Sequence, residues 1–169
     1  VNMYVEKIIG IYHKRRFESL KTIKLESFLL SNNPYLYIDR NALVFSDLVI
    51  DLVDGYLLSR EETLFDDMFV ALAIHVCESV YGGKKSSGEG IDLEFEKDGK
   101  YYIVSIKSGP NWGNSRQIAG MKSDFLKAKR ILRTSGNKPE IVAVNGCCYG
   151  RDNNPDKGDY FKYCGQRFW

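Results

Sequence analysis

The stretch Gly90–Lys107, GIDLEFEKDGKYYIVSIK, indicates a β-hairpin. Its first half alternates apolar and acidic residues, and its second half is rich in β-branched and aromatic residues, both of which are typical of strands. Asp98-Gly99 between the halves is a strong signal for a two-residue hairpin turn. We therefore predict two antiparallel strands, Ile91–Glu96 and Tyr101–Lys107, joined at that turn.

The predicted register gathers polar side chains on one face of this hairpin. If Lys97 faces Lys100, Asp92 lies opposite Ser105, and Lys107 is one diagonal step away on the same face. Glu94 shares this face, whereas the apolar residues of the hairpin point into a core: Leu93, Phe95, Val104 and Ile106.

An acid beside a lysine on such a hairpin fits one kind of chemistry. Desolvating the two charges is costly without a purpose. Carboxylate oxygens are ligands for Mg²⁺, and a neighbouring lysine can orient a water for phosphodiester hydrolysis. The alternative is a surface ion pair between Asp92 and Lys107, which is common and contributes little to stability.

The rest of the chain predicts helices around further strands. Helices are expected over about Tyr4–Leu30, from about Ser46, and from a capping box at Ser59 to about Tyr81. An amphipathic helix over about Ser115–Arg133 and a buried strand, Ile141–Val144, follow, and the remainder is expected to be mostly loop. This order implies an α/β domain whose mixed central β-sheet is flanked by helices, with a helical N-terminal region.

Length and composition predict a single globular domain. The 169 residues are expected to form one domain, 1–169, with a helical part over about 1–81 and a sheet core over about 82–169. Hydrophobic residues make up 44% and charged residues 27%, which excludes a disordered tail. There is no apolar run long enough to cross a bilayer, no signal peptide and no cysteine pair with zinc-site spacing, so we expect a cytoplasmic protein with reduced thiols.

Several motifs resemble a known enzyme family. Gly90-Ile91-Asp92 followed by Ser105-Ile106-Lys107 resembles the D…(D/E)-x-K signature of the PD-(D/E)XK nuclease superfamily. The strings YYIVSIKSGPNWGNSRQ (101–117), VNGCCYGR (144–151) and KGDYFKYCGQRFW (157–169) resemble type II restriction endonucleases of the PmeII-type branch.

The resemblance implies a restriction-endonuclease-like core and a Mg²⁺-dependent, sequence-specific endonuclease that cuts double-stranded DNA. Such an enzyme acts as a homodimer on a near-palindromic site, and a cognate DNA methyltransferase acts on the same site. The family pattern continues beyond Trp169, which implies a further C-terminal helix.

The resemblance also assigns roles. By position, Asp92 is the metal-binding aspartate and Lys107 the motif lysine, with Ser105 at the place usually taken by an acid. Glu78, late in the preceding helix, is slightly favoured over Glu94 as the second metal-binding carboxylate, and Asp124 is a third option.

DNA contacts are expected from two segments beside the hairpin. The basic loop after Gly82-Gly83 can contact phosphates, and the segment after Lys107 carries side chains that bond phosphates or purine edges, although Trp112 is more simply an anchor in the core. The residues predicted to bind DNA are Lys84, Lys85, Ser86, Asn111, Trp112, Asn114, Ser115, Arg116, Gln117 and Arg151.

Two other functions fit the same residues. One is a structure-specific nuclease of DNA repair or recombination, since a fold alone does not fix the substrate. The other is a non-catalytic DNA-binding module derived from a nuclease, in which Ser105 marks the loss of the metal site.

Overall fold

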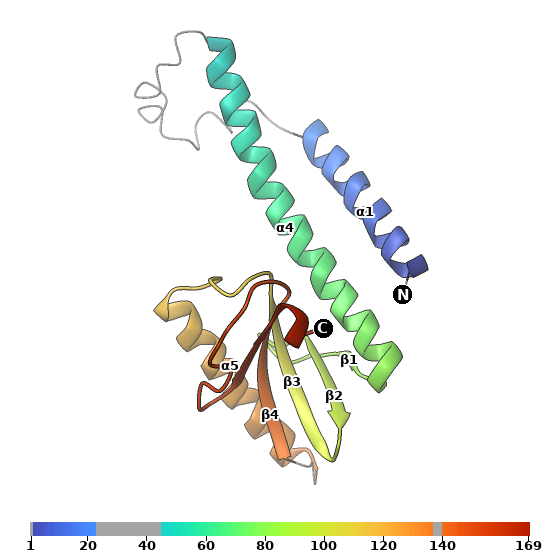
Figure 1. The fold of residues 1–169 in the computed structure, drawn as a ribbon, viewed down its shortest axis with the longest axis vertical. Coiled ribbons are helices and arrows are strands. Elements are labelled where there is room, and N and C mark those ends of the chain that lie inside the picture. Colours follow the sequence, from blue (N-terminus) through green and yellow to red (C-terminus); the bar gives the residue numbers. More distant parts are fainter. Residues whose placement is uncertain (1, 23–44, 137–139) are drawn as a thin grey trace. The chain divides into compact units, whose positions relative to one another are not determined.

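The structure, a computed structural model, describes residues 2–22, 45–136 and 140–169 (Figure 1). The chain divides into two compact units, Asn2–Met68 and Phe69–Trp169. The described residues of the first are almost all helical, and the second contains the sheet. That the whole chain forms one nuclease domain stays a prediction.

Two helices account for the described part of the N-terminal region, α1 (Asn2–Lys21) and α4 (Phe45–Tyr81). The predicted helix start at Ser59 is wrong, because α4 continues through that position. No proline interrupts it, and the Ser59 carbonyl accepts a hydrogen bond from Thr63 Oγ1 (3.2 Å) within the helix. The predicted extension of the first helix to Leu30 lies outside the described residues.

Gly82 and Gly83 end α4, as predicted. Gly82 has a φ of 61°, a left-handed conformation that glycine adopts without strain. The two glycine N–H groups donate to the carbonyls of Glu78 (3.1 Å) and Cys77 (3.3 Å). The chain then turns directly into the sheet.

The sheet has five strands in the order β1-β2-β3-β4-β5. The strands are β1 (Lys84–Lys85), β2 (Leu93–Lys97), β3 (Lys100–Lys107), β4 (Glu140–Cys147) and β5 (Phe161–Cys164). β1, β2 and β3 are antiparallel, whereas β3, β4 and β5 run parallel to one another. The mixed sheet is therefore confirmed, with α5 (Ser115–Thr134) as the crossover between β3 and β4 and a 3₁₀ turn, η1 (Gly165–Arg167), after β5.

The predicted hairpin is confirmed, with one difference at its open end. Lys97 pairs with Lys100, and Asp98 (φ 50°) and Gly99 (φ 69°) both take the positive φ that a type I′ turn needs. The ladder ends at the pair Leu93–Val104, and the Asp92 N–H donates to the Val104 carbonyl (2.8 Å). Asp92 therefore lies just outside the strand and does not pair directly with Ser105.

The two faces of the sheet carry separate apolar cores. Side chains alternate along β3 and β4, so Ile103 and Ala143 pack toward α5, and Val104 and Val144 toward the last turns of α4. The predicted inward residues of the hairpin, Leu93, Phe95, Val104 and Ile106, all belong to the second core or pack against it.

Two short strands were missed by the sequence prediction. Lys84-Lys85 was predicted to be a loop and forms β1, an edge strand beside β2. The tail after β4 was predicted to be mostly loop, yet Phe161–Cys164 pairs with Val144–Cys147. Both strands are too short to show a period, and pairing with a longer neighbour provides their stability.

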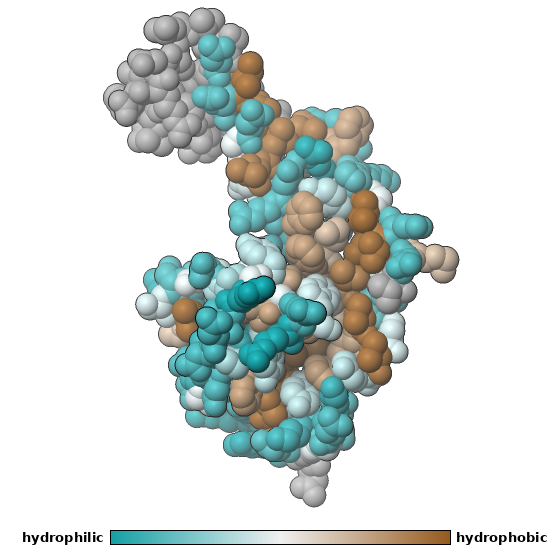
Figure 2. Space-filling model, viewed as in Figure 1, coloured by the Kyte–Doolittle hydropathy of each residue, from teal (hydrophilic) through white to brown (hydrophobic). Residues whose placement is uncertain are grey.

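Helix α4 exposes several hydrophobic side chains. Hydrophobic side chains that remain exposed on α4 include Ile50, Leu58, Phe65 and Val80, and brown residues follow this helix in Figure 2. Within the ranges that the structure describes, no helix is both long and apolar enough to cross a membrane.

A glycine substitution tests the junction between α4 and the sheet. A Cβ on Gly83 would overlap Cys77 Sγ and lie 2.9 Å from Phe95 Cβ and 3.0 Å from the Glu94 carbonyl oxygen. We expect Gly83→Ala to lower the free energy of unfolding by about 1–3 kcal/mol, as overpacking does. Gly120→Ala in α5 is the control, because nothing lies within 4 Å of its Cβ position. Urea unfolding that shows equal stability for the two variants would contradict this packing.

Candidate functional site

Polar side chains gather at the carboxyl ends of the parallel strands. Ser105, Asn145 and Lys162 are register partners across β3, β4 and β5. The next such row contains Lys107, Cys147 and Cys164. In open α/β sheets, ligands bind at this edge, so these rows define the part of the sheet where a site is expected.

Asp92 is held beside this edge by three backbone contacts. Its carboxylate Oδ2 accepts a hydrogen bond from the Ile106 N–H (2.6 Å). Its own N–H donates to Val104 (2.8 Å), and its carbonyl accepts from the Ser86 N–H (3.0 Å). The aspartate is thereby fixed between β1 and β3, with its side chain pointing toward the end of β3.

The charge on Asp92 is opposed by its surroundings. Burial raises the pKa of this carboxyl above its ordinary value, since a half-buried carboxylate loses hydration. The Ile106 N–H and the positive charges of Lys107 and Lys85 offset part of that rise. Asp92 and Lys107 therefore lie near enough to interact electrostatically, as the hairpin register predicts, and Lys85 of β1 adds a second cation.

Lys107 lies against Trp112, which follows it in the loop after β3. The Lys107 ammonium nitrogen is 4.9 Å from the centre of the indole ring. The indole N–H donates to Asn145 Oδ1 (3.0 Å), and Asn145 Nδ2 donates to the Ser105 carbonyl (3.2 Å). Because Asn145 is fully buried, the tryptophan ring rests on a fixed point of the sheet.

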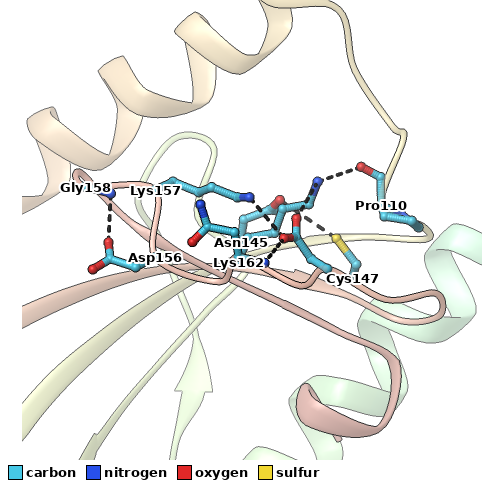
Figure 3. Close-up of polar contacts among 9 residues, drawn as sticks. Pro110, Asn145, Cys147, Asp156, Lys157, Gly158 and Lys162 are labelled. Carbon is cyan, nitrogen blue, oxygen red and sulfur yellow. Dashed lines mark hydrogen bonds and ion pairs between the residues drawn. The ribbon is translucent and has the colours of Figure 1, made fainter.

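A second connection holds the same loop to β5. Lys162 Nζ donates to the Pro110 carbonyl (2.7 Å) and lies 3.6 Å from Asp152 Oδ2, and Figure 3 shows it reaching toward Pro110. Asp152 also pairs with Lys157 (3.0 Å). Lys162 thus holds this loop at the Pro110 carbonyl, and Asn145 holds it at the Trp112 indole.

The candidate carboxylates lie in different places around Asp92. The Glu94 side chain is only 11% exposed, pairs with Lys84 (3.2 Å) and is hydrogen-bonded by Tyr101, whose pKa burial and this carboxylate raise to about 12. Asp124 of α5 packs against Gly90. Glu78 is exposed at the end of α4, which covers the opposite face of the sheet from Trp112.

No group of three metal-binding side chains accompanies Asp92. Across the described ranges, His, Cys, Asp and Glu side chains form no cluster of three that could hold a metal ion. Any metal at this edge would therefore rely on one or two carboxylates, with other ligands from water or from a bound phosphate, which is the way proteins commonly hold Mg²⁺.

The thiols beside the site are buried. All four cysteines are free and buried, as the expectation of reduced thiols requires. Burial, followed by the neighbouring Cys164 thiol, raises the pKa of Cys147 to about 12. The nucleophilic thiolate is therefore scarce at neutral pH.

The residues predicted to contact DNA lie on the surface or close to it, and several also have local roles. Asn114 caps α5: its Oδ1 accepts from the Gln117 N–H (3.1 Å), and Gln117 Oε1 accepts from the Asn114 N–H (2.9 Å). Ser86 Oγ accepts from the Gly88 N–H (3.0 Å). Trp112 packs against the core, as the anchor interpretation predicts. Those exposed to solvent are Lys84, Lys85, Asn111, Asn114, Ser115, Arg116, Gln117 and Arg151.

Two residues of this network were not found by the sequence reasoning. Asn145 directly follows the predicted strand Ile141–Val144, and a buried polar residue beside an apolar run is a signal that could have singled it out. Lys162 lies in a segment predicted to be mostly loop, so its pairing with Asn145 could not be anticipated.

Comparison with known proteins gives the family. No curated protein matches this chain. A family model described as type II restriction endonuclease EcoO109I matches residues 1–169. This match supports the broader resemblance to type II restriction enzymes drawn from the motifs around Asp92 and Lys107. Because the model spans the entire sequence, the chain belongs to the type II restriction endonuclease EcoO109I family.

Proposed function

We propose that this protein is a Mg²⁺-dependent, sequence-specific endonuclease that hydrolyses phosphodiester bonds in double-stranded DNA, in the manner of the PmeII-type branch of the PD-(D/E)XK enzymes. The observation that carries the proposal is the position of Asp92 at the carboxyl end of β3, where its Oδ2 accepts from the N–H of Ile106, the neighbour of Lys107, and the Lys107 charge lowers the pKa of the carboxyl. Asp92 and Lys107 match two positions of the superfamily signature, and Ser105 departs from it at the place of the second acid.

The carboxylate oxygens at this edge fit a Mg²⁺ ion that takes most of its ligands from the bound DNA and from water. Asp92 offers one oxygen to Ile106, which leaves its second oxygen for a cation. We propose Glu94 as the second carboxylate in preference to Glu78, because Glu94 lies on β2, which begins directly after Asp92, and its side chain is mostly buried. A bound Mg²⁺ would act as a Lewis acid toward the scissile phosphate.

Lys107 and Lys85 have a part in this proposal that needs no metal. A phosphodiester gains negative charge as it is attacked, and an ammonium fixed beside it stabilises that charge. Lys107 is held against Trp112 and is therefore placed to orient an attacking water as well. Lys85, which is exposed on the edge strand β1, would contact the DNA backbone.

The remaining partners follow from the same proposal. The exposed polar residues around Asn111–Gln117 and Arg151 would contact phosphates and base edges in a groove. A homodimer would read a near-palindromic site, and a cognate DNA methyltransferase would protect that site. The competing function is a DNA-binding module without catalysis, which the lack of a three-residue metal cluster among the described residues favours.

Plasmid cleavage tests the proposed function directly. With Mg²⁺, we expect wild-type protein to cut plasmid DNA into discrete fragments, and Lys107→Met to lower the rate at least ~100-fold by removing the charge at the phosphate. Fragment ends are mapped by sequencing. Smeared products would indicate a nuclease without sequence specificity, and DNA binding with no cutting would indicate the non-catalytic module.

Asp92→Asn should separate activity from stability. Because the pKa of Asp92 is raised in the folded state, the folded protein favours the protonated form. Its contribution to stability is present at low pH and is lost as the pH rises through the folded pKa, so the ionised group costs stability at pH 7. Asparagine keeps the acceptor for Ile106 without the charge. We therefore expect cleavage to be lost and the melting temperature at pH 7 to rise, by about 2–4 °C for each kcal/mol.

Thermal melts in EDTA at neutral and acidic pH check this prediction. The gain in melting temperature from Asp92→Asn should shrink as the pH falls through the raised folded pKa of Asp92, and should be gone below the unfolded pKa of aspartate. Added Mg²⁺ should stabilise wild type more than Asp92→Asn, since a ligand stabilises the state that binds it. An equal response of the two proteins to Mg²⁺ would remove Asp92 from the metal site.

A set of amide substitutions tests the second carboxylate. We expect Glu94→Gln to lower the cleavage rate at least ~100-fold through loss of a metal ligand, whereas Glu78→Gln and Asp124→Asn should keep most of the activity. Rates are compared across a Mg²⁺ titration, because a lost ligand also raises the Mg²⁺ concentration that is needed. Full activity in Glu94→Gln with loss in Glu78→Gln would reverse the assignment.

A further inference from the structure

The Lys107–Trp112–Asn145 contacts form a chain that leads from the buried centre of the sheet to the proposed site. Asn145 has no exposed surface, and both ends of its amide are used, one by Trp112 and the other by the Ser105 carbonyl. An amide with both ends bonded cannot rotate without losing two hydrogen bonds in a buried setting. The orientation of the Asn145 side chain is therefore fixed by its hydrogen bonds.

Trp112 contacts both Asn145 and Lys107, so the fixed amide of Asn145 also limits where the Lys107 ammonium lies. The indole N–H bond to Asn145 (3.0 Å) sets the direction of the ring, and packing against the core on the α5 face supports the ring. Lys107, at the end of β3, has a long side chain with several rotatable bonds and needs a contact to hold it in one position. Its ammonium lies 4.9 Å from the ring centre, within the range in which a cation is attracted to an aromatic face.

The loop that carries Trp112 is held independently of the tryptophan. Lys162 fixes the Pro110 carbonyl (2.7 Å), the Tyr149 N–H donates to the Ser108 carbonyl (3.0 Å), and a Cβ on Gly150 would lie 2.6 Å from Pro110 Cδ. Figure 3 shows Pro110, Asn145 and Lys162 drawn close together beside this loop. We therefore expect the main chain to keep its path when the Trp112 side chain is replaced.

We propose that Trp112 is a positioning residue for Lys107: its ring holds the lysine ammonium at the end of β3, and Asn145 holds the ring. This inference rests on the proposed function of Lys107 and gives Trp112 a role different from the DNA contact predicted from the sequence. The role differs from that of a core anchor because it acts on the rate of the chemical step and leaves DNA affinity unchanged.

Two substitutions at Trp112 separate the effect of its aromatic ring from that of its N–H donor. Trp112→Phe keeps an aromatic face and removes the N–H donor to Asn145, whereas Trp112→Leu removes both. The control is Tyr81→Leu, which removes a similar contact at the other end of the hairpin, where Lys97 Nζ lies 5.0 Å from the Tyr81 ring centre. All proteins are assayed well below their melting temperatures.

The expected result is a graded loss of rate. Single-turnover cleavage at saturating protein and Mg²⁺ should fall roughly 2- to 30-fold in Trp112→Leu, the range that a lost cation–π contact gives. Trp112→Phe should recover part of that loss, and Tyr81→Leu should cut at the wild-type rate. DNA affinity in Ca²⁺ should change by less than about twofold in the Trp112 variants, which assigns the effect to the chemical step.

A spectroscopic measurement tests the contact without relying on cleavage. The chain has two tryptophans, so Trp169→Phe identifies the indole N–H resonance of Trp112 in a ¹H–¹⁵N spectrum. We expect Lys107→Met to shift this resonance, because it removes a charge from the ring face. An unmoved resonance would overturn the contact.

The outcomes for the two proposals differ. A folded Trp112→Leu protein that cleaves at the wild-type rate would overturn the positioning role alone, as would a loss confined to DNA affinity. Wild-type protein that cleaves no DNA under any of these conditions would overturn the proposed function together with the positioning role. The resonance shift would then still report whether the contact exists.

Discussion

The hydrogen bond from the Ile106 N–H to the Asp92 carboxylate is the contact on which the organisation of the site depends. The β2–β3 ladder ends at Leu93, and beyond it a side chain takes the place of a backbone acceptor. An N–H group left without a partner in the buried part of β3 would be costly. The same bond therefore completes the sheet and places an acid beside the strand that carries Lys107.

This arrangement keeps a destabilised charge at the end of the strand. Burial opposes ionisation of Asp92, and the cations Lys107 and Lys85 compensate only in part. Perturbed carboxylates of this kind are common at functional sites, and a bound cation would supply the compensation that Asp92 lacks. The row from Ser105 to Lys162, in contrast, satisfies its polar groups internally and provides the rigid support.

The sequence predicts the features of this fold that local interactions determine. Asp98-Gly99 fixes the hairpin turn, and the alternation of apolar residues fixes which side chains enter the core, so the proximity of Asp92 and Lys107 follows from the register. Features that depend on distant pairing were missed. β5 is stable because β4 lies beside it, and the links from Asn145 to Trp112 and from Lys162 to Pro110 join residues far apart in the chain. The wrongly predicted helix start at Ser59 has the reverse cause, since a capping motif has no effect inside a helix that continues through it.

The parallel pairing of β3, β4 and β5 also governs when the site can assemble during protein synthesis. Chains fold from the N-terminus as they leave the ribosome. The hairpin can form once β3 has emerged. The loop that carries Trp112 gains its hydrogen bond to Asn145 only when β4 has been made, and its hydrogen bond from Lys162 only when β5 has been made. A nascent chain therefore carries the acid and the lysine well before the loop beside them is held in place.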